Sequence, residues 1–394
     1  IVGLAYFVSA EISLTMGLSN ILLVAVGYLY FISSGTPISE GDLVLSRTGA
    51  YLGYAAILLY TGRTHYVLIF KKAFGFGRAD ESEQASVMAA RLVLISFVAF
   101  VVLLTIMGLD WVVALLFSLT LMLMFLVFAR IMCETGIPFM QPGWAPGTFL
   151  TALFGPVAIG PGPMVFIMYL GTILCQDPRE CLIPFVSTSI KIADDARLRI
   201  KRFFWMLIGT IIVALVIGFL ATSWTTYNFG GMSLDSWASY YVPRLCFNDA
   251  TKHIAEITET GLIKDSLALN GIEKLSRFSP GIGVLKCLGS GLIAVTLFSL
   301  LRFRFSKFPL HPVIFLVWGT YPAMICWASF LLGWGIKSLV VHFGGGRVYQ
   351  NLKPVFIGII AGELLISGVS ILVESVYYFV TGDAVPVKFN ILPR

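Results

Sequence analysis

Charged residues are scarce in this sequence. Asp, Glu, Lys and Arg make up 12% of the 394 residues, whereas hydrophobic residues make up 58%. A soluble globular domain carries roughly 25% charged residues, so this composition excludes an ordinary water-facing surface. The sequence also lacks the recurring alternation of apolar and polar residues that a membrane β-barrel needs. We therefore predict an all-α polytopic integral membrane protein with about eight to ten transmembrane helices.

The common motifs of enzymes and metal sites are also missing. No G-x-x-x-x-G-K-[ST] phosphate loop, H-E-x-x-H zinc motif or G-x-S-x-G nucleophile motif occurs. The six cysteines form no C-x-x-C, and the C-x5-C pair of Cys175 and Cys181 has no histidine nearby. We therefore expect no metal, no cofactor and no enzymatic activity.

The apolar segments divide the chain into three parts. Residues 1–223 predict membrane helices, residues 224–283 an extracytoplasmic loop with room for one or two amphipathic helices, and residues 284–394 the C-terminal membrane helices. The first apolar run, Ile1 to Phe31, fits either one long helix or two pieces that meet near Gly17. It starts with no basic region before it, so we expect that further sequence precedes Ile1.

The region after Arg130 departs from continuous helices. It reads C-E-T-G-I-P-F-M-Q-P-G-W-A-P-G, and the apolar residues that follow are interrupted by G-P-V-A-I-G-P-G-P. Because proline breaks helices and each half is too short to span a bilayer, we predict a broken segment near 148–175. It is either a re-entrant hairpin or one discontinuous helix, with its irregular backbone inside the protein or facing a cavity. Such interruptions point to transport sites.

Basic clusters orient the chain in the membrane. They lie at Lys71 and Lys72, at residues 197–202 and near Arg302, and a re-entrant broken segment would put all three on one face. The positive-inside rule makes that face cytoplasmic, which places residues 224–283 outside and the C-terminus inside. This use of the net charge of +6 also argues against nucleic-acid binding.

Two carboxyl groups lead the candidate site residues. Glu363 lies inside an apolar segment, after Gly358 and Gly362, where small residues let another backbone approach. It can take up a proton or pair with a cation, or it is a structural carboxyl bonded to a neighbouring helix. Glu134 stands at the mouth of the broken segment, where it can meet a substrate amine or pair with Arg130 four residues earlier. We expect these two carboxyls to share one site.

Two further residues complete the predicted substrate- or proton-binding set. Glu11 interrupts the first long apolar run, and its role stays open between function and structure. His311 lies between Pro309 and Pro312. A histidine there can relay protons near neutral pH, or it can simply hold the turn.

Several stretches resemble the oligopeptide transporter superfamily. Gly358–Glu363 reads G-I-I-A-G-E, which is similar to an element near the end of those proteins. A bacterial branch of the superfamily is similar at four further stretches: Ala5–Ser13, Ala129–Phe139, Phe308–Val313 and Leu331–Tyr349. The resemblance implies proton-coupled import of small peptides or metal chelates. It also implies that this chain holds roughly the C-terminal two thirds of the fold.

We therefore expect a secondary transporter of small peptide-like or metal-chelate solutes, driven by protons, in a bacterial inner (cytoplasmic) membrane. Its partners would be the lipid bilayer, the solute and protons, with no nucleic acid. The alternative is a non-transporting structural subunit of a larger membrane complex, in which the carboxyl groups join helices. Whether the chain forms a homo-oligomer or joins such a complex stays open.

Overall fold

The computed structural model describes residues 1–77, 80, 83–137, 140–175, 182–198, 200–231, 237–305 and 307–382. Cys181, Arg199 of the second basic cluster, and Pro138 and Phe139 of the region after Arg130 lie outside these ranges. Within them every regular element is helical, and seven stretches are long and apolar enough to cross a membrane. The last stretch contains two helices, α17 (Tyr321–Leu339) and α18 (Gly345–Thr381), joined by a π-helical turn, Val340–Gly344. The predicted all-α polytopic membrane protein is confirmed.

The chain divides into two compact units. Unit 1 comprises Ile1–Ile38, Thr135–Met140 and Leu297–Arg394, and unit 2 comprises Ser39–Glu134 and Gln141–Thr296. This grouping differs from the three parts expected from apolarity along the chain. The first and last membrane helices belong to one unit, and residues 224–283 belong to the other.

Unit 1 is built on α2 (Ala10–Ser34) and α17, which pack along one another. Gly17 makes this possible, because a Cβ atom there would lie 2.8 Å from the Cα atom of Leu331. The shorter helices α1 (Val2–Phe7) and α16 (Ile314–Val317) complete the unit with α18. The first apolar run is therefore two pieces, but they meet at Val8 and Ser9. The predicted meeting point near Gly17 was wrong, since that glycine serves close packing inside α2.

Unit 2 holds most of the remaining helices. They are α3 (Glu40–Thr61), α4 (Arg63–Ala73), α5 (Gln84–Ile106), α6 (Trp111–Thr135, the last residue in unit 1), α10 (Leu182–Asp195), α11 (Ile200–Phe229) and α15 (Ile282–Arg304, which passes into unit 1 at Leu297). Ser39 begins α3 with a reciprocal capping box to Asp42. Where α3 passes α15, a Cβ atom at Gly49 or Gly291 would overlap a backbone carbonyl of the other helix. Small residues thus let these two backbones touch.

The broken segment is a helical hairpin. It consists of α7 (Pro146–Phe154), α8 (Pro156–Ile159) and α9 (Pro161–Cys175), each with a proline at its start. Gly155 and Gly160 separate the helices at φ +83° and +89°, a backbone that glycine adopts without strain. A Cβ atom at Gly147 would lie 2.5 Å from the Ile167 carbonyl oxygen, and one at Gly171 would lie 3.3 Å from the Ala145 Cβ atom. The helices therefore run antiparallel, as one of the two predicted forms requires.

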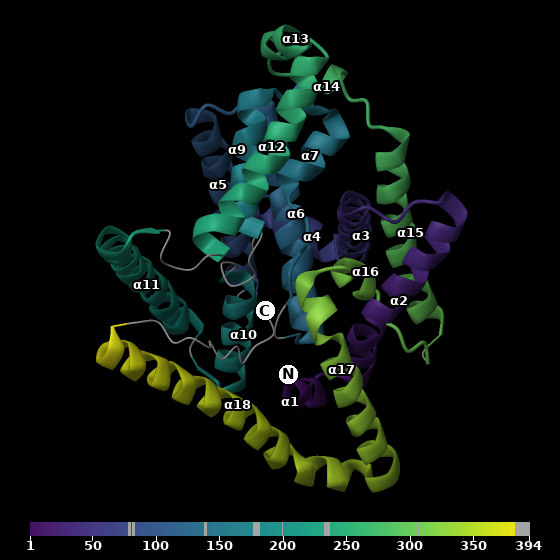
Figure 1. Ribbon diagram of the computed structural model, residues 1–394, viewed down its shortest axis with the longest axis vertical. Coiled ribbons are helices and arrows are strands. Elements are labelled where there is room, and N and C mark those ends of the chain that lie inside the picture. Colours follow the sequence, from purple (N-terminus) through teal and green to yellow (C-terminus); the bar gives the residue numbers. More distant parts are fainter. Residues whose placement is uncertain are drawn as a thin grey trace. The chain divides into compact units, whose positions relative to one another are not determined.

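Residues 242–276, the central part of the predicted loop 224–283, cover this hairpin. After a π-helical turn, Trp237–Tyr241, they form α12 (Val242–Glu259), α13 (Ile263–Ala268) and α14 (Glu273–Ser276). Helix α12 packs along α9, and all three helices contact α8. Figure 1 shows α7, α9 and α12 side by side, with α13 and α14 at one end of the group. The connection expected to be a loop is thus a helical cover on the broken segment.

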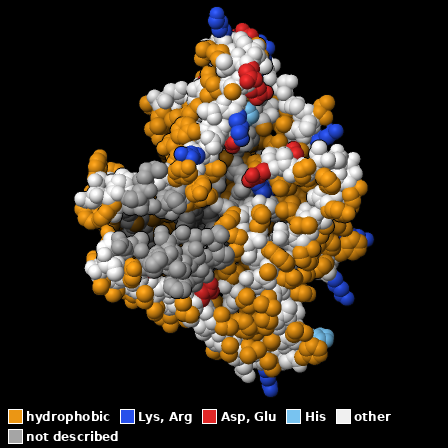
Figure 2. Space-filling model, in the orientation of Figure 1, with side chains coloured by type: hydrophobic (Ala, Val, Ile, Leu, Met, Phe, Trp, Pro, Cys, Tyr) orange, Lys and Arg blue, Asp and Glu red, His pale blue; other side chains and the backbone are white. Residues whose placement is uncertain are grey.

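Much of the surface is apolar. None of the membrane-length window of α11 is buried, and only 11% of the window in α5 is buried. Hydrophobic side chains cover most of the face shown in Figure 2, where charged side chains are few. Helices with exposed apolar side chains and internally bonded backbones suit a lipid environment.

Candidate functional site

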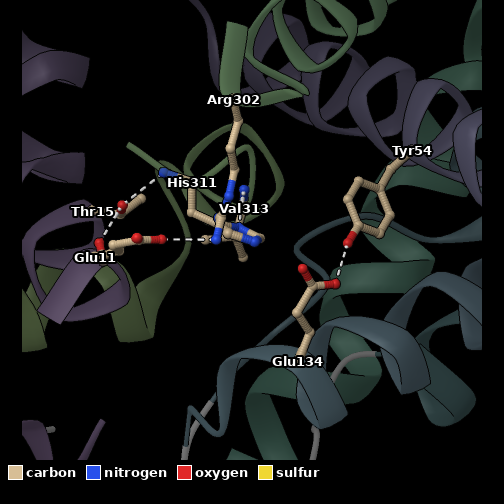
Figure 3. Close-up of polar contacts among 7 residues, drawn as sticks. All are labelled: Glu11, Thr15, Tyr54, Glu134, Arg302, His311 and Val313. Carbon is tan, nitrogen blue, oxygen red and sulfur yellow. Dashed lines mark hydrogen bonds and ion pairs between the residues drawn. The ribbon is translucent and has the colours of Figure 1, made fainter. Parts of the chain in front are cut away.

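Glu11 forms an ion pair within unit 1. Its Oε2 atom lies 2.7 Å from an Nη atom of Arg302 at the end of α15, and both side chains are partly exposed (Figure 3). Protonation of Glu11 would remove this ion pair with a permanently charged guanidinium. The geometry therefore favours a helix-joining role for Glu11.

His311 is buried in the turn before α16. Its backbone N–H donates to Thr15 Oγ1 at 2.9 Å, and its ring Nδ1 accepts the Val313 backbone N–H at 3.1 Å (Figure 3). This bond assigns the proton of the neutral ring to Nε2. A proton on Nδ1 would break the bond to Val313. The contacts thus favour the turn-holding interpretation over the proton relay.

Glu134 connects two helices of unit 2. The Tyr54 hydroxyl in α3 donates to Glu134 Oε2 at 2.9 Å (Figure 3), and Arg130 Nε lies 3.2 Å from the same oxygen. The expected pair with Arg130, four residues earlier on α6, is therefore present. Glu134 joins α6 to α3 immediately before the chain turns toward the hairpin.

Glu363 lies on α18 with its side chain 32% exposed. Its Oε2 atom is 3.0 Å from the Ile1 nitrogen at the start of α1. Within the described residues no Lys or Arg side chain pairs with it. Among the described residues, no atom beyond the local helix backbone lies within 4 Å of where a Cβ atom of Gly358 or Gly362 would stand, so the expected close approach at these two glycines is not found there. Glu363 belongs to unit 1 and Glu134 to unit 2, so a site shared by the two stays a prediction.

Lys337 was missed by the sequence analysis. Its Nζ donates at 2.7 Å to the carbonyl oxygen of Val8, which is freed where α1 ends. The Tyr6 ring stacks on Phe356 and Tyr349 beside this break, and Ser13 Oγ donates to the Ala5 carbonyl at 2.8 Å. The α1/α2 break, at Val8 and Ser9, is thus closed by aromatic packing. A lone lysine within an apolar helix was the signal that could have identified Lys337.

Lys274 was also missed, because residues 224–283 have the composition of a solvated loop. It is only 7% exposed, and its Nζ donates at 3.3 Å to the Ile159 carbonyl, where α8 ends. Asp110 Oδ2 lies 3.8 Å from the same Nζ. The two Asp110 oxygens accept the backbone N–H groups of Val112 and Gly271 at 3.0 and 2.8 Å. Asp110 therefore holds the α13–α14 connection against the turn between α5 and α6.

A pocket opens beside Lys274. It has a volume of about 350 Å³ and lies between the α5–α6 turn, the Gly160–Pro161 break and the α13–α14 region. We call it the hairpin pocket, and its walls include Leu109, Asp110, Gly160, Pro161, Ser266 and Lys274. Ser266 is 3% exposed, and its hydroxyl has no hydrogen-bond partner among the described residues. The hairpin break, at Gly160 and Pro161, leaves room for a ligand, whereas stacked aromatic rings lie beside the α1/α2 break.

Arg47 supports the irregular chain that leads into the hairpin. It is 3% exposed within α3, and its Nε and Nη2 atoms donate to the Gly143 carbonyl at 3.1 and 2.7 Å. Arg47, Lys274 and Lys337 therefore share one task, since each donates to a backbone carbonyl that a helix interruption leaves free. The sequence pattern favours the carboxyl groups as candidates, but in the structure these three cations bind the backbone carbonyls that the helix interruptions leave free.

A family model for a family of unknown function, DUF6785, matches residues 1–385. The chain belongs to this family. No curated protein and no solved structure matches the chain. Since the DUF6785 description states no activity, the function of this member has to be argued from its geometry.

The hairpin pocket of this DUF6785 chain offers groups that can bind a ligand. The hairpin pocket offers an ammonium group, a hydroxyl group and apolar walls. In the ranges that the structure describes, no group of three His, Cys, Asp or Glu side chains could hold a metal ion. Such a pocket suits recognition of a small polar solute.

Proposed function

We propose that this membrane protein is a secondary transporter that moves a small solute by alternating access. One observation carries the proposal: each unit contains an apolar helical segment interrupted by non-helical residues, with a lysine ammonium on the carbonyl at the interruption. Backbone of this kind is tolerated at membrane depth only inside protein or beside a cavity. Discontinuous helices of this type form the solute and ion sites of many transporters.

The proposal extends to the class of solute and to the membrane in which the protein lies. A peptide-like or metal-chelate solute suits a pocket that presents both an ammonium and a carboxylate beside apolar walls. The resemblance to oligopeptide transporters supports the same class. We place the protein in a bacterial inner membrane, with residues 224–283 on the outer side.

Proton coupling is assigned to Glu363. Glu11 and Glu134 each bind an arginine, and the His311 ring holds a backbone N–H, so protonation would break an existing contact at each of them. Glu363 pairs with no Lys or Arg side chain within the described residues. Its contact is with the Ile1 nitrogen, so proton uptake at Glu363 would cost no pair with a Lys or Arg side chain of the described residues.

The test is uptake into proteoliposomes under an imposed proton gradient, with a panel of labelled small peptides and metal chelates. We expect gradient-driven uptake of at least one solute and its loss in Glu363→Gln. Glu374→Gln is the matched control, since Glu374 lies on the same helix and has no assigned role. Absence of uptake across the whole panel would reject the proposal.

A structural subunit is the second candidate. The observation in its favour is that both carboxyl groups join helices: Glu11 joins α2 to α15 through Arg302, and Glu134 joins α6 to α3 through the Tyr54 hydroxyl. Cross-linking in native membranes followed by purification tests it. Fixed stoichiometry with other subunits, together with unimpaired function of that assembly in Glu363→Gln, would support this candidate over transport.

A further inference from the structure

The hairpin pocket is a built site at a helix interruption. Gly160 and Pro161 form one wall, where α8 ends and α9 begins. Pro161 and Pro163 have no N–H groups, so the start of α9 offers an apolar surface there. Ile159, Leu109 and several residues of the α13–α14 region extend this apolar lining.

Ser266 is an independent indication of a ligand. Other buried hydroxyls, such as those of Thr151 and Thr172, donate to the carbonyl four residues earlier in their own helix. The carbonyl four residues before Ser266 is that of Leu262, and it accepts the Ser266 backbone N–H. The Ser266 hydroxyl does not donate to it. Instead the hydroxyl lies 3.7 Å from where a Cβ atom of Gly160 would stand. A buried hydroxyl without a partner is unfavourable unless something else satisfies it.

Lys274 supplies the charge. Its ammonium has three N–H donors, and one of them binds the Ile159 carbonyl. Asp110 lies 3.8 Å away, at ion-pair but not hydrogen-bond distance. Because backbone N–H groups already occupy both Asp110 oxygens, the carboxylate is fixed in place. Donor capacity of Lys274 therefore remains for an acceptor in the pocket.

We propose that the hairpin pocket binds a small organic carboxylate. Its oxyanion would accept from Lys274 and Ser266, and its apolar body would lie against Leu109 and Pro161. The volume of about 350 Å³ suits such a molecule, since it falls at the low end of known ligand pockets. As a solute site this pocket rests on the proposed transport function, but as a binding site it stands alone.

Calorimetry on the full chain in lipid nanodiscs tests the proposal, with empty nanodiscs as the blank for lipid partition. The probes are hexanoate, its uncharged analogue hexanamide, and inorganic phosphate. We expect hexanoate to bind at least about tenfold more tightly than hexanamide, because one charge-assisted hydrogen bond is worth roughly that factor. Phosphate should bind more weakly than hexanoate, since it lacks an apolar body.

Ser266→Ala is the decisive variant. It should weaken hexanoate binding about tenfold while the protein keeps its melting temperature, since the hydroxyl has no partner to lose. Ser276→Ala is the matched control, because that nearby hydroxyl bonds within its own helix and lies outside the pocket. Lys274→Met should abolish the preference for hexanoate over hexanamide.

Three results would overturn the inference: no binding of hexanoate, equal binding of hexanoate and hexanamide, or unchanged binding in Ser266→Ala. If phosphate bound as tightly as hexanoate, the pocket would not recognise the apolar part of the ligand and would be a simple anion site. The two proposals fail separately. Hexanoate binding without any proton-driven uptake rejects transport alone, whereas uptake that Ser266→Ala and Lys274→Met both leave unchanged rejects this pocket as the solute site.

Discussion

The α1/α2 break in unit 1 and the hairpin break in unit 2 solve one problem in two ways. Each leaves a backbone carbonyl without its helical partner, and each places a lysine ammonium on that carbonyl. In unit 1 the rings of Tyr6, Tyr349 and Phe356 stack beside the break. In unit 2 the break opens into a pocket that contains an unpartnered hydroxyl.

This difference distinguishes a break with a structural role from a break that can bind a ligand. A break that is packed shut by aromatic rings can hold a helix in position, but it has no place for a ligand. A break with an open pocket and a hydroxyl group that lacks a hydrogen-bond partner has room for a ligand. The comparison therefore assigns a structural role to Lys337 and a binding role to Lys274, although both donate to a carbonyl.

The largest expected effect lies in the packing of the hairpin itself. Gly147→Ala would push a methyl group to 2.5 Å from the Ile167 carbonyl oxygen and should lower the free energy of unfolding by about 3 kcal/mol, at the upper end for overpacking. Denaturant unfolding in mixed micelles measures it. Gly162→Ala, in the same hairpin with open space around it, is the control. Equal stability of the two variants would mean that α7 and α9 do not pack as described.

The second effect tests how the α1/α2 break is closed. Lys337→Met leaves the Val8 carbonyl without its donor, which should reduce unfolding free energy by about 2 kcal/mol. Lys353→Met is the control, because Lys353 lies over the same Tyr349 ring but donates to no carbonyl of the described residues. The same unfolding assay applies. A destabilisation as large in Lys353→Met would assign the effect to the ring contact instead.

A pair of serines gives the third test. Ser13→Ala removes a buried hydrogen bond to the Ala5 carbonyl, so we expect a loss of about 1 kcal/mol. Ser266→Ala removes an unpartnered hydroxyl and should leave stability unchanged or slightly higher. Thermal unfolding of the two variants without ligand measures this difference in stability. A large loss in Ser266→Ala would show that its hydroxyl has a structural partner.

The smallest effect concerns thiol reactivity on the cover of the hairpin. Burial raises the pKa of the Cys246 thiol in α12, so less thiolate forms at pH 7 and labelling by a membrane-impermeant maleimide should be slow. The rate should rise with pH, because the thiolate is the reactive form. Leu267→Cys, at a side chain 65% exposed beside the pocket, should label rapidly from outside intact cells. Labelling only after permeabilisation would put this cover on the cytoplasmic face.

Local chemistry made part of this architecture predictable. Prolines and glycines at residues 155–163 predicted the broken segment, because they act on the backbone wherever they occur. The pairing of Glu134 with Arg130 followed from helical spacing. The ion pair between Glu11 and Arg302 joins residues far apart along the chain, and no local sequence pattern predicts such a contact.

The rest depended on tertiary structure. No proline or glycine marks Val8 and Ser9, so the sequence predicted either one long helix or two pieces that meet near Gly17, and not a break at this point. Lys274 lies in a stretch of solvated composition, and only the packing of α13 and α14 on α8 buries it. The hairpin pocket forms from three separate stretches of sequence, which no spacing rule connects.

The crossing of α3 and α15 has a mechanical consequence. Methyl groups at Gly49 or Gly291 would overlap the carbonyl oxygens of Leu288 and Ser46, so the two backbones are in direct contact. Helices that touch through side chains can slide by rotamer changes, but backbone contact offers no such freedom. In the proposed transport cycle, on the microsecond to millisecond scale of domain motions, these helices would travel as one rigid body. The hinge of that cycle must then lie elsewhere in the chain.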